Sequence, residues 1–344
     1  MEYPLLWQLF VFPAKPISPK SEANMSEETA RLKNFPIAWF SIIMGMAGFA
    51  IAWAKTEQLF SLGIDISPWL LGLTVVLAVL LAALYLAKLA IYPGEVAAEV
   101  RHPVKLAFVP TVSISLILLA IATLHAAPQA SFWMWSAGTV LHLMLTLYVL
   151  SSWIHHGKYE IQHLNPAWFI PVVGNILVPI AGMHHAPAEI SWFFFSAGLF
   201  FWPVLTAILF YRLIFHASLP ERMMPTLFIF IAPPAVGFIS YLSLVGSVDA
   251  FAMMLYCVGL FFTLLLVTQI AYFSRLKFFL SWWAYSFPLA AITIATLAMA
   301  EHTGGALFYM LATILLAILS LVIIGLIALT LLAVFRRDIC VEGH

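Results

Sequence analysis

The sequence predicts an all-helical integral membrane protein with ten membrane-spanning helices, and three observations support this prediction. Hydrophobic residues make up 64% of the 344 residues and charged residues only 9%, whereas a soluble fold carries roughly a quarter charged residues. Ten segments are apolar over about the 20 residues that a spanning helix needs. Basic residues fall almost entirely on one side of these segments. The 15 basic and 15 acidic residues balance, and we expect no nucleic-acid partner.

The ten segments follow one another along the chain with only short connections between them. The fifth is short, and the last is long enough to tilt or to extend beyond the bilayer. We expect an N-terminal tail at 1–33, a ten-helix membrane domain at 34–335 and a C-terminal tail at 336–344. The predicted spans are 35–54, 67–90, 104–125, 130–153, 166–183, 189–214, 225–245, 249–272, 281–300 and 305–335.

The N-terminal tail is polar and contains proline. Its apolar run LLWQLFVF is too short to span a membrane and has no basic residue before it, so we expect no signal peptide. A more ordinary start, MSEETARLK, begins at Met25. Met1 and Met25 therefore both remain candidate starts.

The location of charge predicts the orientation of the spans. Fourteen of the fifteen basic residues lie in the tails or at the connections that lead from an even span to the next odd span, and Lys55 alone lies on the other side. By the positive-inside rule, both termini face the cytoplasm. An even number of spans is then required, and ten satisfies it. We expect a multi-pass protein of the inner or plasma membrane.

Prolines and glycines recur at matched positions in alternate spans. A unit of about 60 residues that holds two spans gives every copy the same orientation, and parallel repeats can surround a shared axis. Because proline bends a helix, we expect an inner ring of kinked odd spans facing a lumen, with the even spans packed closely around it. In the first span, Ile43 and Met44 stand where the proline would be. The prolines are Pro110, Pro171, Pro233 and Pro288, and the glycines are Gly72, Gly138, Gly198 and Gly259.

Four stretches carry a resemblance to a known family. They are FPIAWFSIIMGMAGFAIAW at 35–53, EVRHPVK at 99–105, WFIPVVGN at 168–175 and WWAYSFP at 282–288. In these stretches the chain resembles bacterial TehA tellurite-resistance proteins and plant guard-cell slow anion channels, whose family also contains fungal malate and sulfite transporters. Together with the ten-span pattern, the likeness covers nearly the whole chain beyond residue 33.

The resemblance implies a homotrimer in which each protomer has its own pore inside five helical hairpins of quasi-five-fold arrangement. It also implies that a phenylalanine of the ninth span blocks the pore midway, and the matching residue is Phe287. An apolar constriction closed by such a ring excludes water. Two residues depart from the bacterial type. Ser41 stands where a glycine is expected and narrows the lumen, and Pro288 replaces a glycine beside the gate, as in plant members.

The few polar groups of the spans bear on what such a lumen conducts. No Asp, Glu, Lys or Arg lies in the central part of a predicted span, which favours passive conduction over proton-coupled transport. Asn175 and Ser286 either line the lumen or satisfy a bent backbone. Carbonyl groups freed by the prolines favour cations, whereas basic loops at the cytoplasmic face raise the local anion concentration. Anion selectivity therefore follows from the family resemblance and not from the residues alone.

Histidines and cysteines predict no metal site and no cofactor. The spacing H-E-x-x-H is absent, and only His142 lies deep in a span, so we expect it to bond a neighbouring helix. The two cysteines, Cys257 and Cys340, have no metal-binding spacing. The charged residues before the third span form either a solvated ion-pair face or a dock for that loop; they are Glu99, His102 and Lys105.

Three classes of function compete. The first, which we favour, is a passive anion channel gated by Phe287. The second is a carrier or exporter for C4-dicarboxylates, sulfite or tellurite. The third, a membrane enzyme or haem protein, is disfavoured because the ligand spacings are missing, and we expect no enzymatic activity. The expected partners are membrane lipid, small inorganic or organic anions and two further copies of the chain. The physiological anion and the gating stimulus do not follow from the sequence.

Overall fold

The structure is a computed structural model that describes residues 31–155, 157–336 and 338–340. These residues form helices and no strand, and ten of the helical segments within them are long and apolar enough to cross a membrane. The prediction of an all-α protein with ten spans is therefore confirmed. Most of the predicted N-terminal tail, with both candidate starts, lies outside the described residues, as do residues 337 and 341–344 of the predicted C-terminal tail.

Each odd span begins with a 3-10 helix and continues as an α-helix, whereas each even span is a single α-helix. The odd spans are η3 (Ile37–Trp39) with α2 (Phe40–Phe60), η4 (Lys105–Phe108) with α5 (Thr111–Thr123), η6 (Pro166–Trp168) with α7 (Phe169–Val173), η7 (Gly174–Leu177) and α8 (Val178–His185), η8 (Glu221–Ile231) with α10 (Ala232–Val245), and η9 (Leu280–Tyr285) with α13 (Ser286–Thr303). The even spans are α3 (Ser67–Ile91), α6 (Pro128–His155), α9 (Ala188–Phe215), α11 (Ala250–Val267) and α14 (Ala306–Phe335). Short helices outside the spans are α4 (Pro93–Arg101), η5 (Ile161–His163) and α12 (Ile270–Phe273).

Burial separates the spans into an inner and an outer set. In the odd spans 56–83% of the residues of the apolar window are buried, and in the even spans only 11–39%. We therefore call the odd spans inner and the even spans outer. Outer spans expose large apolar side chains such as Trp69 and Leu321, as contact with lipid requires.

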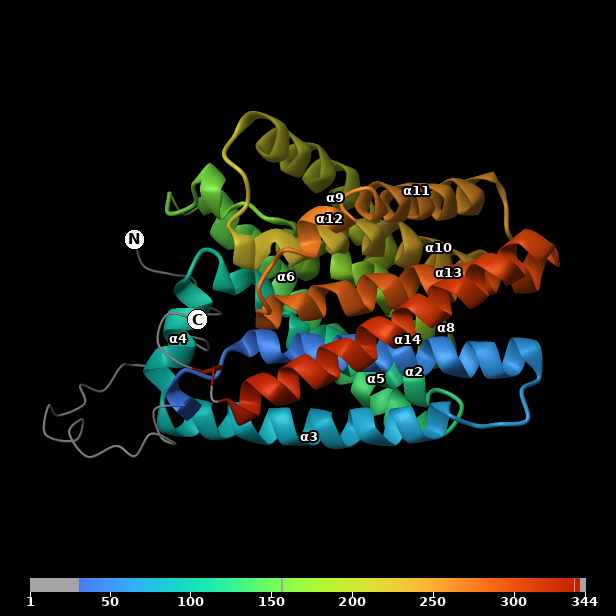
Figure 1. The fold of residues 1–344 in the computed structure, drawn as a ribbon, viewed down its shortest axis with the longest axis horizontal. Helices are drawn as coiled ribbons and strands as arrows, with labels where there is room; N and C mark the ends of the chain where they lie inside the picture. The colour runs from blue at the N-terminus through green and yellow to red at the C-terminus, as the bar shows by residue number, and fades with distance from the viewer. Residues whose placement is uncertain (1–30, 156, 337, 341–344) are drawn as a thin grey trace, which may run out of the picture.

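One end of the molecule carries exposed basic side chains. The inner spans begin at this end, beside the last turn of α14 (Figure 1). Exposed residues here include Lys105, Arg222 and Arg336. We call it the basic end.

The prolines of the inner spans mark the change from 3-10 to α geometry, which corrects the expectation of kinks within long α-helices. Pro110 is the N-cap residue of α5, and Pro233 occupies the first turn of α10. Pro288 is the third residue of α13. The first four N–H groups of a helix have no intrahelical partner, so proline is tolerated there without loss of a hydrogen bond. Only Pro171 lies inside a short helix, α7, which passes directly into η7.

Three of the four repeated glycines let an outer span approach an inner span closely. A Cβ on Gly138 of α6 would lie 3.1 Å from the backbone nitrogen of Ile117, and one on Gly198 of α9 would lie 3.0 Å from that of Ile176. A Cβ on Gly259 of α11 would lie 3.4 Å from the backbone nitrogen of Ala235. The expected close packing of these outer spans is confirmed. Gly72 of α3 has no such neighbour among the residues that the structure describes.

Candidate functional site

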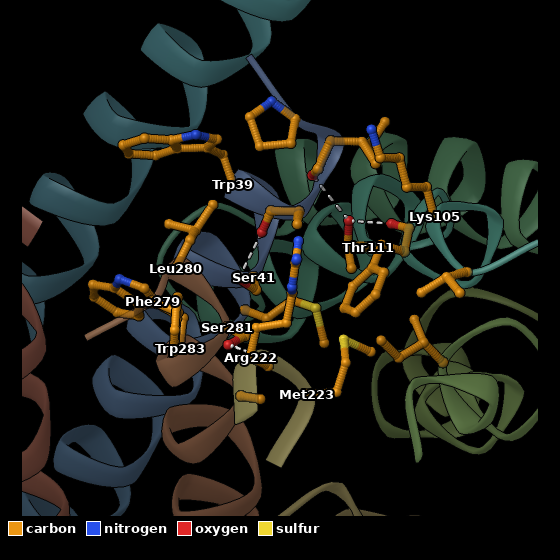
Figure 2. A pocket seen from close by; sticks show the side chains of 18 of the residues that line it. Trp39, Ser41, Lys105, Thr111, Arg222, Met223, Phe279, Leu280, Ser281 and Trp283 are labelled. Atoms are coloured by element: carbon orange, nitrogen blue, oxygen red, sulfur yellow. Dashed lines mark hydrogen bonds between the residues drawn. The ribbon is translucent and has the colours of Figure 1, made fainter. Parts of the chain in front are cut away.

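A wide cavity of about 1140 Å³ lies at the basic end, lined by all five inner spans together with residues of α3, α4 and α14. Aromatic and aliphatic side chains make up much of its wall, among them Trp39, Phe169 and Trp283. Polar groups interrupt this wall, and Figure 2 shows Arg222 projecting toward the same space as Ser41 and Thr111. The cavity therefore combines an apolar wall with cationic and hydroxyl groups near its opening.

Charged residues around the wide cavity leave a small positive excess. Five basic residues and four acidic residues of the described chain line it, a net charge of 5 − 4 = +1 with histidine neutral. Two of the acidic residues are already engaged, because Glu95 pairs with Lys33 at 3.6 Å and Glu99 pairs with Lys88 at 2.8 Å. Among the described residues, no carboxylate forms an ion pair with the remaining basic groups, which are Lys105, Arg222 and Arg336. These cations are available to an anion in the cavity.

The ion pair of Lys88 and Glu99 is buried beside the cavity. Its side chains are 1% and 7% exposed. Lys88 Nζ also donates to the carbonyl oxygen of Phe35 at 2.7 Å, and the Tyr85 hydroxyl donates to the second oxygen of Glu99 at 2.8 Å. Of the two roles left open for the cluster before the third span, the geometry favours docking for Glu99: this carboxylate ties α4 to α3 and to the chain that enters η3.

His102 and Lys105, the other members of that cluster, are exposed and line the wide cavity. His102 Nδ1 accepts hydrogen bonds from the backbone nitrogens of Val104 and Lys105 at 3.1 and 3.3 Å. Partial burial, and then the positive charges of Lys105, His163 and Lys158, lower the pKa of His102 below its usual value. The ring is therefore neutral at pH 7, and protonation would add a positive charge to the opening of the cavity.

The aromatic ring of Phe287 lies at the inner limit of the wide cavity. It is a lining residue of this cavity and also of a second, narrow cavity of about 40 Å³. Leu177 of η7 and Val236 of α10 are likewise shared between the two. The ring stands beside Gly48 of α2, whose missing Cβ would lie 3.4 Å from Phe287 Cδ2. Phe287 is therefore one of three residues that border both spaces.

Every described residue that lines the narrow cavity is apolar. The lining comes from all five inner spans and consists of Gly48, Ile51, Leu118, Ile121, Leu177, Ile180, Val236, Ile239, Phe287, Ala291 and Ile294. A space of this size holds about one water molecule. No hydrated anion fits there without a change in the wall.

The predicted site residues divide between the wall of the wide cavity and the packing behind it. Ser41, Pro233, Phe287 and Pro288 line the wide cavity, and the Ser41 hydroxyl donates to the carbonyl oxygen of Ala38 at 2.6 Å. The residues that line neither cavity are Pro110, Pro171, Asn175 and Ser286.

Asn175 and Ser286 serve the helix packing. Asn175 is 1% exposed and donates to the Thr146 hydroxyl at 3.0 Å and to the Val172 carbonyl at 2.7 Å. Ser286 is fully buried and donates to the Trp283 carbonyl at 2.6 Å. Ser286 also packs where α13 meets α2 most closely, since a Cβ on Gly45 would lie 2.6 Å from Ser286 Cβ. Both side chains therefore satisfy backbone groups or a neighbouring helix.

His142 bonds a neighbouring inner span. This fully buried side chain of α6 lies 2.9 Å from the Ser113 hydroxyl of α5 through Nδ1. Its ring packs against Gly174, where an added Cβ would come within 2.9 Å of it. Within the described part of the chain, no group of three or more His, Cys, Asp or Glu side chains is arranged to hold a metal ion.

Sequence reasoning did not select Arg222, Thr111 or the isoleucines of the narrow cavity as site residues. Arg222 resembled one more loop cation, and Thr111 stood in an ordinary apolar segment. The isoleucines are separated by 70, 59, 59 and 55 residues along the chain. This recurrence follows the hairpin repeat and is the signal that could have found them.

Comparison with known proteins identifies the family. The family model for SLAC1, described as a voltage-dependent anion channel, matches residues 34–331. The chain belongs to this family. The SLAC1-family match covers all ten spans almost to the end of α14. It includes every lining residue of the narrow cavity and most of those of the wide cavity.

Relatives within the family come from plants, archaea and bacteria. The chain is 28% identical to the S-type anion channel SLAH2 of Arabidopsis thaliana over 90% of this chain and 61% of that protein. It is 27% identical to the uncharacterized transporter MJ0762 of Methanocaldococcus jannaschii, over 77% of this chain and 84% of that protein. It is also 27% identical to the tellurite resistance protein TehA homolog of Haemophilus influenzae, over 79% of this chain and 83% of that protein. The chain spans 61% and 50% of the lengths of the plant relatives SLAH2 and SLAH3. Anion channels or transporters are thus the general class to which it is related.

Proposed function

We propose that the chain is a passive anion channel whose pore is closed by Phe287. The observation that carries this proposal is the place of one aromatic ring between two cavities, the wide cavity at the basic end and the narrow cavity beyond it. All five inner spans contribute residues to both cavities, and in this proposal the conduction path from one cavity to the other passes Phe287. The family match and the plant relatives named as anion channels support anions as the conducted species.

Closure rests on exclusion of water by the ring. Phe287 lines both cavities together with Leu177 and Val236, and an apolar constriction blocks ions because water leaves it. The ring is partly exposed although its neighbours Ser286 and Pro288 are buried. Rotation about its side-chain torsions moves the ring between staggered positions. Opening then needs no large displacement of α13.

Selectivity for anions arises from the basic opening in this proposal. The lining carries a net charge of +1, with Lys105 and Arg222 free of carboxylate partners among the described residues. A field of this sign raises the local concentration of anions at the opening. The described residues of the narrow cavity beyond it carry no negative charge that would favour cations.

The basic end faces the cytoplasm in this proposal, because the positive-inside rule places basic connections there. Both termini then lie in the cytoplasm of a protein of the inner or plasma membrane. Residues 34–335 form the channel domain, with 1–33 and 336–344 as cytoplasmic tails, and three protomers assemble with one pore each. Cysteine labelling from each side of the membrane and native mass spectrometry test these two points. No enzymatic reaction is proposed.

A carrier for C4-dicarboxylates, sulfite or tellurite oxyanions is the second candidate. The related transporter of Methanocaldococcus jannaschii and the tellurite resistance homolog of Haemophilus influenzae favour it by their names. A carrier alternates access to a central site, so its flux saturates with anion concentration and exchanges one anion for another. A channel shows neither property at low occupancy.

Anion flux from proteoliposomes tests the proposed function. Chloride, nitrate, sulfite and malate fluxes are compared for the parent, for Phe287→Ala and for Phe261→Ala, which alters an outer-span ring that is 61% exposed. We expect Phe287→Ala to raise flux by about tenfold or more, which corresponds to a barrier lower by about 1.4 kcal/mol, and Phe261→Ala to leave it unchanged. Equal flux in all three proteins would contradict the gate.

A further inference from the structure

The narrow cavity is built from two stacked layers of apolar side chains. One isoleucine comes from each of the five inner spans, and we call this set the isoleucine ring: Ile51, Ile121, Ile180, Ile239 and Ile294. Three residues before each isoleucine stands a second lining residue from the same span: Gly48, Leu118, Leu177, Val236 and Ala291. The ninth span adds a third lining residue, Phe287. Residues three apart lie on the same face of a helix, one turn from each other. The isoleucine ring is therefore the layer farther from the wide cavity.

Burial supports an inward orientation of the isoleucine ring. All five side chains are partly exposed, although they lie on the most buried spans of the molecule. On α13, Phe287 and Ile294 are the partly exposed residues of the stretch from Ser286 to Ala300, and the rest of that stretch is buried. Since Ile294 lines the narrow cavity, its exposed surface faces this interior space.

We propose that the isoleucine ring is a second hydrophobic barrier, in series with Phe287, that limits conduction once the aromatic ring has moved. This inference rests on the proposed channel function and deepens it. The lining offers no donor to an anion that has lost its water, because each described residue of the narrow cavity is apolar and transfer of an ion without compensating hydrogen bonds is unfavourable. Removal of the phenylalanine ring leaves this unfavourable free energy of ion transfer unchanged.

The two proposed barriers also differ in how they can open. Phe287 is a single side chain that can rotate, whereas the isoleucine ring takes one member from each inner span. This barrier falls either when the five inner spans move apart or when the side chains of the isoleucine ring are replaced by more polar ones. Substitution tests the second route without a change in helix packing.

The experiment compares currents through reconstituted protein in the Phe287→Ala background. Into this background we introduce the pair Ile121→Thr and Ile239→Thr, which keeps a β-branched side chain and adds two hydroxyl groups to the ring. We expect chloride current at least about threefold above that of Phe287→Ala alone, because even a modest fall in the barrier changes the rate by such a factor. Equal currents in the presence and absence of the threonines would overturn the isoleucine ring as a barrier.

Two control pairs separate polarity from size and from general effects. Ile121→Val and Ile239→Val shorten the same side chains and keep them apolar, so we expect a smaller gain than with threonine. Ile314→Thr and Ile324→Thr change the outer span α14, where the two side chains are 47% and 63% exposed, and we expect no gain. An equal gain with valine or with the α14 pair would overturn the proposal. Melting temperature and oligomeric state confirm that every variant is folded.

The same set of proteins distinguishes the two barriers. Comparison of Phe287→Ala with the parent tests the gate, and comparison of the threonine pair with Phe287→Ala tests the isoleucine ring. If Phe287→Ala shows no current and conducts only after the threonine pair is added, Phe287 is refuted as the main barrier and the isoleucine ring is supported. A conducting Phe287→Ala protein with no further gain would support the gate and refute the ring.

Discussion

At the scale of single residues, the proposed gate depends on how closely α2 and α13 approach beside Phe287. A Cβ on Gly45 would lie 2.6 Å from Ser286 Cβ, and one on Gly48 would lie 2.8 Å from Ala290 Cβ. These separations leave no room for another side chain. The helices on both sides of the aromatic ring are therefore held together, and movement at this level falls to the ring itself.

Gly48→Ala is expected to destabilise the protein by about 1–3 kcal/mol, because overpacking of a well-filled contact forces a backbone shift. Ala290→Gly removes the atom that the new methyl group would meet and should restore most of the loss. Thermal unfolding of the purified variants measures both effects. Gly72→Ala is the matched control, since its added Cβ would have no neighbour within 4 Å among the described residues outside the adjacent turns of α3. Equal melting temperatures for Gly48→Ala and Gly72→Ala would contradict the tight seam.

His102 is expected to make conduction sensitive to pH at the basic end. Burial and neighbouring positive charges lower its pKa, so the ring is neutral at pH 7 and gains charge only as the pH falls below its ordinary value of about 6.5. Acidification of that side should raise anion current through Phe287→Ala, and His102→Gln should reduce this rise. The folded protein also holds fewer protons on His102 than the unfolded chain, so this residue lowers stability as the pH falls. An unchanged pH profile in His102→Gln would exclude this role.

At the scale of elements, a buried ion pair fixes the short helix α4 beside the opening. Lys88 belongs to α3 and Glu99 to α4, and the lysine also binds the Phe35 carbonyl just before η3. One contact therefore joins three segments that surround the wide cavity. Loss of either charge leaves its partner buried without compensation.

Lys88→Met is expected to cost about 3–5 kcal/mol of stability, the usual effect of breaking a buried pair by removal of one partner. Glu99→Gln added to Lys88→Met should recover much of it, because the uncompensated charge is gone. Lys33→Met serves as the control: the pair of Lys33 with Glu95 is 31% and 44% exposed, so its loss should cost less than about 1 kcal/mol. Thermal unfolding in detergent compares the four proteins. A double variant no more stable than Lys88→Met would argue against charge pairing as the cause.

The sequence predicted the spans well and the local geometry of the inner spans less well. Apolar segments of about 20 residues indicate spans directly, and all ten predicted segments overlap an observed one. The prediction of kinks at Pro110 and Pro233 was wrong, because a proline looks the same in the sequence whether it lies within a helix or at its start. Whether such a proline kinks a helix or begins one depends here on the 3-10 helices that precede it. No residue pattern in the sequence predicted these 3-10 helices.

At the scale of the whole molecule, five repeated hairpins place an apolar lumen inside an apolar shell. The inner spans bury their outward surfaces against the outer spans, and the outer spans expose theirs. A lumen formed in this way needs little polar lining over its narrow part, since water has only to be excluded there until opening. The two cavities, both lined by residues of all five inner spans, follow from this arrangement.

The candidate site could be predicted only in part. Phe287 and Ser41 came from the family resemblance, because by residue type a phenylalanine or serine in a span is ordinary. Asn175 was named for its polarity, yet it is buried and bonds Thr146 behind the wall. The side of a helix that faces a lumen cannot be told from the side that faces another helix when both are apolar. Hydrophobic periodicity therefore carried no information about the narrow cavity.

Single-channel recording of Phe287→Ala in a planar bilayer tests the central claim most directly. The parent and the lipid-facing variant Phe261→Ala provide the comparison in symmetric chloride. A pore closed by this ring predicts discrete current steps in Phe287→Ala that are absent or rare in the other two proteins. Phe287→Ala records without steps, from protein shown to be folded and inserted, would contradict Phe287 as the barrier that closes the pore.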